Sequence, residues 1–92
     1  MVLIALPNET QVVRIGVTAG RSVGKAVQRN RAKRVLRSVM QPYLHQLRAG
    51  WDVVLIARVR LLEASFQQTQ AALVNLLGRA RLLANHERPS EP

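Results

Sequence analysis

The chain contains no cysteine, and this absence excludes disulfide bonds, thiol chemistry and cysteine-based metal sites. It also lacks any apolar run long enough to cross a bilayer. The N-terminal run Met1–Leu6 has six residues, whereas a spanning helix needs about 20. The same run is too short to form the core of a signal peptide. We therefore expect a protein of the reducing cytoplasm that does not span a membrane.

Acidic residues are scarce, and their positions leave most of the positive charge unopposed. The five acids are Glu9, Asp52, Glu63, Glu87 and Glu91. Fourteen lysines and arginines give a net charge of +9, and no acid lies between Thr10 and Trp51. This excess is greater than solubility requires, and it favours a polyanionic partner such as nucleic acid or an anionic membrane surface.

The few acids and histidines form no catalytic or metal-binding pattern. Asp52 and Glu63 are eleven positions apart and have no third acid to complete an acid–base pair. His45 and His86 have no partner at the spacing of metal ligands. We therefore expect no catalytic residue, and no metal bound by the protein alone.

Apolar patterning predicts one domain over residues 1–84, because 92 residues with 48% hydrophobic content can form a single modest core. Val2–Leu6 and Gln11–Thr18 are β-prone runs separated by a turn signal, and we expect them to pair as a hairpin. The nearly continuous apolar run Trp51–Arg58 predicts a central strand that is covered on both faces.

The last predicted helix begins at Ser65 and Gln68, which fit a capping box, and runs to about Asn85. Its core stripe is expected to comprise Phe66, Leu73, Leu77, Ala80 and Ala84. The polar, proline-bearing residues 85–92 are expected to be disordered. The element order is then β-β-α-(α)-β-α, an α+β two-layer sandwich with a helical crossover between strands.

Most of the positive charge lies on a helix predicted over Val23–Met40. Ser22 is its expected N-cap, and Pro42 is expected to open a short second helix that ends at Leu47. The residues predicted to pack on the sheet are Ala32, Val35, Leu36 and Val39.

Arg29, Lys33 and Arg37 follow one another at intervals of four, and we expect them nearly opposite the packing arc, with Asn30 and Arg34 beside them. A merely solvated helix face would normally carry acid–base pairs at this spacing, and this one has none. A membrane-surface helix would present a more aromatic or leucine-rich face, so we expect no membrane partner. A row of cations can instead contact successive phosphates and release their counterions. We interpret the surface as a nucleic-acid contact, and charge alone does not distinguish RNA from DNA.

The segment GVTAGRSVGKAVQRNRAKRVLR resembles the signature of the bacterial ribonuclease P protein subunit. The pattern G-x-A-V-x-R-N-R-x-K-R-x-L-R occupies positions 24–37. The strand WDVVLIAR and the leucine-rich last helix also fit, so the resemblance covers about residues 2–84. The resemblance implies RNA contacts at Arg21, Lys25, Arg29, Asn30, Arg31, Lys33, Arg34 and Arg37.

The resemblance implies a small basic protein that joins a large catalytic RNA and assists it in removing the 5′ leader from precursor tRNA. It places the catalytic centre and its Mg²⁺ on the RNA, and it implies no obligate protein partner. The implied fold is like domain 2 of ribosomal protein S5, with a sheet face that receives the leader and a left-handed βαβ crossover, against the general rule. The alternative is a non-catalytic, ribosome-associated or general RNA-binding module of the same fold.

Some features depart from the family pattern. Arg21 and Ser22 replace a usual pair of lysines, and Ser38 stands where an acid often follows the motif. Family members begin with a basic segment and an aromatic helix that forms one wall of the leader cleft, whereas this chain starts at the following strand. We expect either a start assigned too late or a shortened protein with weaker leader binding.

Overall fold

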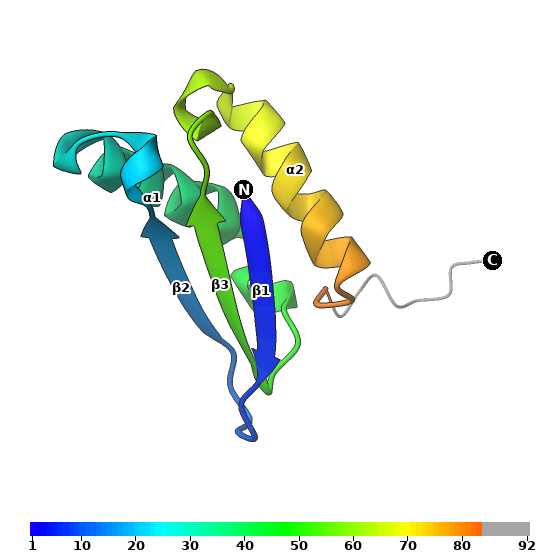
Figure 1. Ribbon diagram of the computed structural model, residues 1–92. Coiled ribbons are helices and arrows are strands. Elements are labelled where there is room, and N and C mark those ends of the chain that lie inside the picture. The colour runs from blue at the N-terminus through cyan, green and yellow to red at the C-terminus, as the bar shows by residue number, and fades with distance from the viewer. Residues whose placement is uncertain (84–92) are drawn as a thin grey trace.

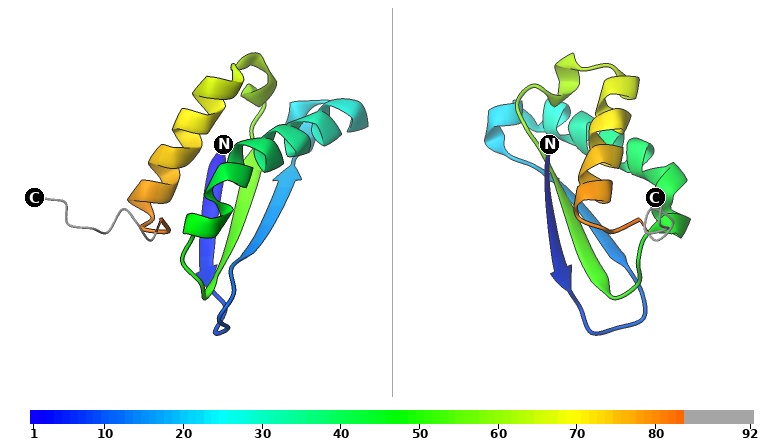
Figure 2. Two further views of the ribbon diagram at one scale, coloured as in Figure 1. Left: turned by 180° about the vertical axis from the view of Figure 1, so that it is seen from behind. Right: turned by 90° about the vertical axis from the view of Figure 1, so that its right-hand side faces the viewer.

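The computed structural model describes residues 1–83, which form a three-stranded sheet with helices on one face (Figures 1 and 2). The strands and α-helices are β1 (Val2–Pro7), β2 (Arg14–Ala19), α1 (Ala26–Met40), β3 (Trp51–Ala57) and α2 (Phe66–Arg79). Three short 3₁₀ helices connect them: η1 (Arg21–Val23), η2 (Gln41–Gln46) and η3 (Leu61–Glu63). The predicted α+β class and the order of the main elements are confirmed.

Strand β3 lies at the centre of the sheet, antiparallel to β1 and parallel to β2, in the order β1-β3-β2. The expected hairpin between the first two strands is therefore wrong. The link between β1 and β2 instead straddles the start of β3: the Asn8 N–H donates to the Gly50 carbonyl, and the Gly50 N–H donates to the Val12 carbonyl, each at 2.9 Å. The central position gives β3 a hydrogen-bonded neighbour on each edge. This suits β3, which is the most apolar of the three strands.

The β2-α1-β3 unit has a left-handed crossover. In the view of Figure 1 both parallel strands point upward, β3 stands to the right of β2, and α1 passes behind the sheet. The left panel of Figure 2, which is seen from behind, shows α1 in front of the strands. The handedness implied by the family resemblance is thus confirmed, and it is the opposite of that found in most βαβ units.

The core lies between the helices and one face of the sheet. Its fully buried large side chains are Leu36, Val39, Met40, Val53, Leu55, Leu73, Leu77, Leu82 and Leu83. The other face of the sheet is not covered by any part of the chain that the structure describes, since Ile4 is 42% exposed and Leu6 57% exposed. Val54, the partner of Ile4 on β3, is half-buried. The expectation that β3 is covered on both faces is therefore wrong for the described residues.

The start of α2 follows the sequence prediction. The Ser65 Oγ accepts a hydrogen bond from the Gln68 N–H at 3.0 Å, and the Gln68 Oε1 accepts one from the Ser65 N–H at 2.9 Å. The capping box is thus confirmed. Phe66, however, is 49% exposed and does not belong to the core.

The end of α2 differs from the prediction, because the helix stops at Arg79 and not near Asn85. Arg81 has a left-handed backbone (φ 58°), and the Leu82 N–H donates to the Leu77 carbonyl at 3.0 Å. This hydrogen bond across the helix end is typical of a Schellman motif, which usually has glycine at the left-handed position. The missing glycine explains why the sequence pattern suggested a longer helix.

The chain then folds back so that Leu82 and Leu83 enter the core. Ala80 was expected in the core but is exposed, and the side chains of Leu82 and Leu83 are buried there instead. Ala84 and the segment 85–92, expected to be core and disordered respectively, lie outside the described residues.

Candidate nucleic-acid interface

Helix α1 begins at a glycine-dependent turn and not at the expected Ser22 cap. Ser22 lies inside η1, and Lys25 is the N-cap residue. Gly24 has a φ of 137°, and a Cβ added there would lie 3.1 Å from the Cβ of Gln28. The Lys25 N–H donates to the Gln28 Oε1 at 3.0 Å. The reciprocal hydrogen bond of a capping box is not possible here, because the lysine ammonium cannot accept a hydrogen bond from the Gln28 N–H. This turn presents Arg21 and Lys25, both exposed, at the entrance to the basic helix.

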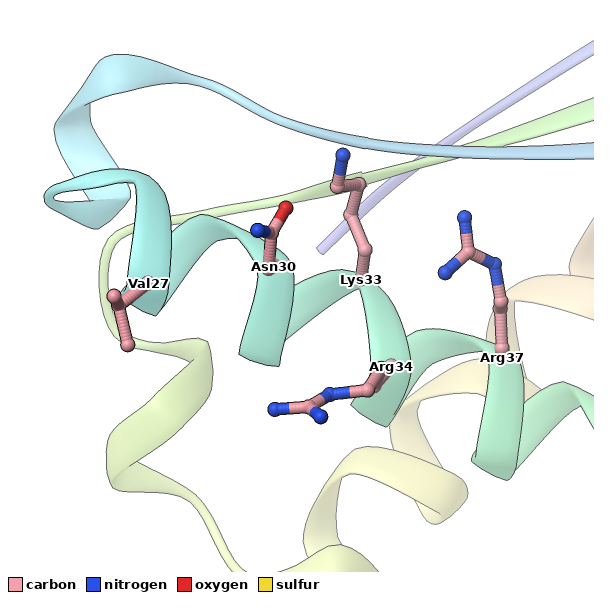
Figure 3. Close-up of a pocket in the computed structure, with 5 residues that line it drawn as sticks. All are labelled: Val27, Asn30, Lys33, Arg34 and Arg37. Carbon is pink, nitrogen blue, oxygen red and sulfur yellow. The ribbon is translucent and has the colours of Figure 1, made fainter.

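The outer side of α1 carries a shallow basic hollow (Figure 3). Its lining residues are Val27, Asn30, Lys33, Arg34 and Arg37. Four of these were predicted as site residues. Val27 was not, although it is 75% exposed. Val27 is seven residues before Arg34, which places the two within about 20° of each other on a helical wheel, and this spacing was the available signal in the sequence.

The expected outward row of Arg29, Lys33 and Arg37 is only partly right. Arg37 is exposed, but Arg29 and Lys33 are half-buried. Seven helical residues turn through almost two full circles, so Arg29 lies within about 20° of the buried Leu36. The buried residues of α1 are Ala32, Leu36, Val39 and Met40, so its packing arc is centred near Leu36. Arg29 and Lys33 therefore lie to one side of this centre and not on the outer face.

Arg29 has a buried donor without an acceptor. Its Nε is shielded from solvent and has no hydrogen-bond partner among the described residues. A buried donor left unpaired typically costs about 1–3 kcal/mol. Because Arg29 is only half-buried, another molecule can contact the exposed part of its side chain but not the shielded Nε.

A second charged cluster lies away from α1, where the three strands meet the β1–β2 link. The Arg14 Nε and Nη2 each donate to the Asp52 carboxylate at 2.7 Å, and the Asn8 Nδ2 donates to the Asp52 Oδ1 at 2.9 Å. The hydrogen bonds from Arg14 and then Asn8 lower the pKa of Asp52 below its usual value. The same pair raises the pKa of Arg14. Asp52 therefore joins strands and is held as a carboxylate.

Within residues 1–83, no three His, Cys, Asp or Glu side chains lie close enough to hold a metal ion together. Neither α1 nor α2 has the length and apolar character of a membrane-spanning helix. The described surface of α1 presents several cations and the Asn30 amide, which are groups that can bind phosphates and base edges.

The fold and this surface define a small α+β nucleic-acid-binding domain. The family model for ribonuclease P matches residues 1–81. The ribonuclease P protein component of Herpetosiphon aurantiacus is 38% identical over 91 residues, which are 99% of this chain and 74% of that protein. That of Chloroflexus aggregans is 40% identical over 88 residues, 95% of this chain and 65% of that protein. The chain belongs to the ribonuclease P protein family, the protein part of a tRNA-processing endoribonuclease.

Solved structures agree with this assignment. The RNase P protein of Staphylococcus aureus superimposes with a TM-score of 0.76 at 27% identity, covering 88% of this chain and 74% of that one. The protein from Thermotoga maritima gives 0.73 at 31% identity, covering 84% and 74%. The fold implied by the sequence resemblance is therefore confirmed, and a different kind of RNA-binding module is not favoured.

Proposed function

We propose that this chain is the RNA-binding subunit that assists the catalytic RNA of ribonuclease P in removing the 5′ leader from precursor tRNA. The observation that carries this proposal is the ordered motif of residues 24–37, most of which lies on α1 with exposed basic side chains, in a chain of this family. The motif itself contains no acid, and no carboxylate of residues 1–83 forms an ion pair with its cations. These cations are therefore available to an RNA partner. A reducing cytoplasm, the compartment of catalytic RNA and tRNA, suits a chain without cysteine.

The contacts proposed for this surface are Arg21, Lys25, Arg29, Asn30, Arg31, Lys33, Arg34 and Arg37. Arginines and lysines bind phosphates through charge-assisted hydrogen bonds and displace the counterions of the RNA. Asn30 adds a neutral donor and acceptor for a sugar or base edge.

In this proposal Mg²⁺ is held by the RNA, as the family resemblance implies. The protein's own contribution is to neutralise phosphates that would otherwise repel each other. Cleavage should therefore need less Mg²⁺ when the protein is present.

The uncovered face of the sheet is the proposed location of the single-stranded leader. Ile4 and Leu6 on β1 and Val54 on β3 leave apolar surface accessible there. Apolar surface of this kind can contact the faces of unpaired bases. We propose no protein partner for either surface.

The test is a binding titration against the cognate catalytic RNA over a range of salt concentrations, together with cleavage of precursor tRNA at low Mg²⁺. The logarithm of affinity should fall by about 0.7–0.9 per contacted phosphate for each unit of log salt. Cleavage at low Mg²⁺ should accelerate with the protein. Affinity that is insensitive to salt, or cleavage that the protein does not change, would contradict the proposal. Cofractionation with ribosomes without any effect on cleavage would indicate the general RNA-binding module.

A further inference from the structure

A second hollow lies between α1, η3 and the start of α2, and it has a volume of about 200 Å³. Its lining residues are Arg31, Val35, Leu61, Leu62, Ala64 and Phe66. Drug-sized ligands occupy sites of about 300 Å³ or more. This hollow is smaller and open to solvent, so it suits one planar group and not an extended ligand.

Phe66 is the unusual member of the lining. It is 49% exposed, whereas Tyr43 and Trp51 pack against the core. Phe66 is the first residue of α2, ahead of the buried positions Thr69 and Leu73, so its ring has no place in the core. A half-exposed ring presents a flat apolar face of the kind on which unpaired bases stack.

Arg31 provides a cation at the same hollow. It is exposed, and no carboxylate of the described chain pairs with it. On the helical wheel it lies on the flank of α1 opposite Arg29, about 160° away. The basic surface of α1 therefore continues past Arg34 and reaches the hollow.

We infer that this hollow binds one unpaired nucleotide of the RNA partner, with its base stacked on Phe66 and its phosphate paired with Arg31. Val35 and Leu62 provide an apolar floor that removes the base from water. Arg31 can bind a phosphate through two parallel hydrogen bonds. Paired bases are already stacked inside a duplex, so the site selects an unpaired residue. The inference rests on the proposed RNA partner and adds a base contact to a surface that otherwise binds phosphates.

Charge favours RNA over an apolar protein segment as the occupant. A protein segment could cover Phe66 and Leu62, but it would bury Arg31 without a described carboxylate beside it. Each nucleotide of an RNA strand carries both a base and a phosphate. A strand that follows α1 can therefore stack a base on the Phe66 ring and pair a phosphate with the Arg31 guanidinium.

The test compares Phe66→Leu, which keeps apolar bulk but removes the ring, with Phe66→Tyr, which keeps the ring. Because stacking on a side chain is worth about 1–3 kcal/mol, Phe66→Leu should weaken binding to the catalytic RNA by about 5- to 150-fold. Phe66→Tyr should bind within about 2-fold of the unchanged protein. The salt dependence should be the same for all three proteins, because no phosphate contact is lost. The melting temperature of each variant checks that it is folded.

A short single-stranded oligouridine, with a duplex of equal length as control, is the second probe. Phe66→Leu should weaken binding of the single strand and leave duplex binding unchanged. Equal affinity of Phe66→Leu and the unchanged protein for both the catalytic RNA and the single strand would overturn the inference, as would equal losses in Phe66→Leu and Phe66→Tyr. If oligouridine binding depends on Phe66 while the catalytic RNA is not bound, the proposed function fails and the nucleotide site stands.

Discussion

Arg29 and Arg31 are two positions apart in the motif, but the helix directs them to opposite flanks of α1. Arg29 is half-buried beside the core arc and has a shielded Nε, whereas Arg31 is exposed at the hollow of Phe66. Asn30, between them, lines the outer hollow of Figure 3. The three residues of the RNR motif thus present three sides of one helix to an RNA, so each is expected to contact a different part of it.

Arg34 provides the simplest test of a phosphate contact, because it is exposed and lies on the outer side of α1. Arg34→Ala should reduce the slope of log affinity against log salt by about one unit, since one phosphate contact is lost. Its free energy of unfolding should change by less than about 0.5 kcal/mol. Salt-dependent binding to the catalytic RNA and urea unfolding provide the two measurements.

Arg79→Ala is the matched control for Arg34→Ala. It removes the same charge from an exposed position on α2, away from the outer hollow of α1. It should leave the salt slope nearly unchanged. If Arg79→Ala and Arg34→Ala reduce the slope equally, binding depends on net charge and not on the surface of α1.

At the scale of elements, the turn before α1 determines where the basic helix begins. Gly24 combines a positive φ with close approach to Gln28. Gly24→Ala should therefore destabilise the fold by about 1–3 kcal/mol and weaken RNA binding, because the turn sets the positions of Arg21 and Lys25. Thermal or urea unfolding measures the first effect.

Gly20→Ala is the control for this turn. Gly20 has a φ of −79°, and no atom lies within 4 Å of a Cβ added there. The alanine should be tolerated with little change in stability. Equal losses at Gly20 and Gly24 would mean that general stiffening of the loop, and not the conformation of Gly24, is responsible.

The ends of the helices show which structural details could be predicted from local sequence patterns and which could not. The Ser65–Gln68 capping box was predictable because both partners are three residues apart on one helical turn. The end of α2 was not, because Arg81 adopts the left-handed conformation that glycine usually provides. Ser22 suggested a cap by residue type alone, but the positive φ of Gly24 moved the start of the helix to Lys25.

At the scale of the whole molecule, Asp52 connects segments that are distant in sequence. Its carboxylate accepts hydrogen bonds from Arg14 on β2 and from Asn8 after β1. Asp52 has a lowered pKa in the folded chain, whereas an unfolded Asp titrates near about 3.9. The stabilisation is therefore fully present above that value and is lost as the pH falls through the lower pKa of the folded state.

Asp52→Asn should lower the free energy of unfolding at neutral pH. The difference in this free energy between the variant and the unchanged protein should become smaller below about pH 4. Urea unfolding at a series of pH values measures this difference. Glu63→Gln, which removes an exposed carboxylate outside the Arg14 cluster, controls for the loss of charge. A constant difference between Asp52→Asn and the unchanged protein across the series would contradict a pH-dependent role for the cluster.

The sequence alone determined the chemistry of this protein and the types of its elements. Periods of two and 3.6 residues follow from local backbone geometry, so the strands, the basic helix and its unopposed charge could be predicted directly. The ordered motif of residues 24–37 was also a local pattern, and it indicated the family that the comparisons then confirmed.

Only the tertiary structure decided the strand order, the rotation of α1 and the exposure of Phe66. Each depends on contacts between distant segments: β3 inserts beside β1, Leu36 and Met40 turn Arg29 to a flank, and Leu82 and Leu83 fill the core. Phe66 has the residue type of a core position, but packing leaves its ring half exposed beside Arg31. Local periodicity cannot specify which of several apolar residues the limited core will bury, because that choice is made by the packing of the whole chain.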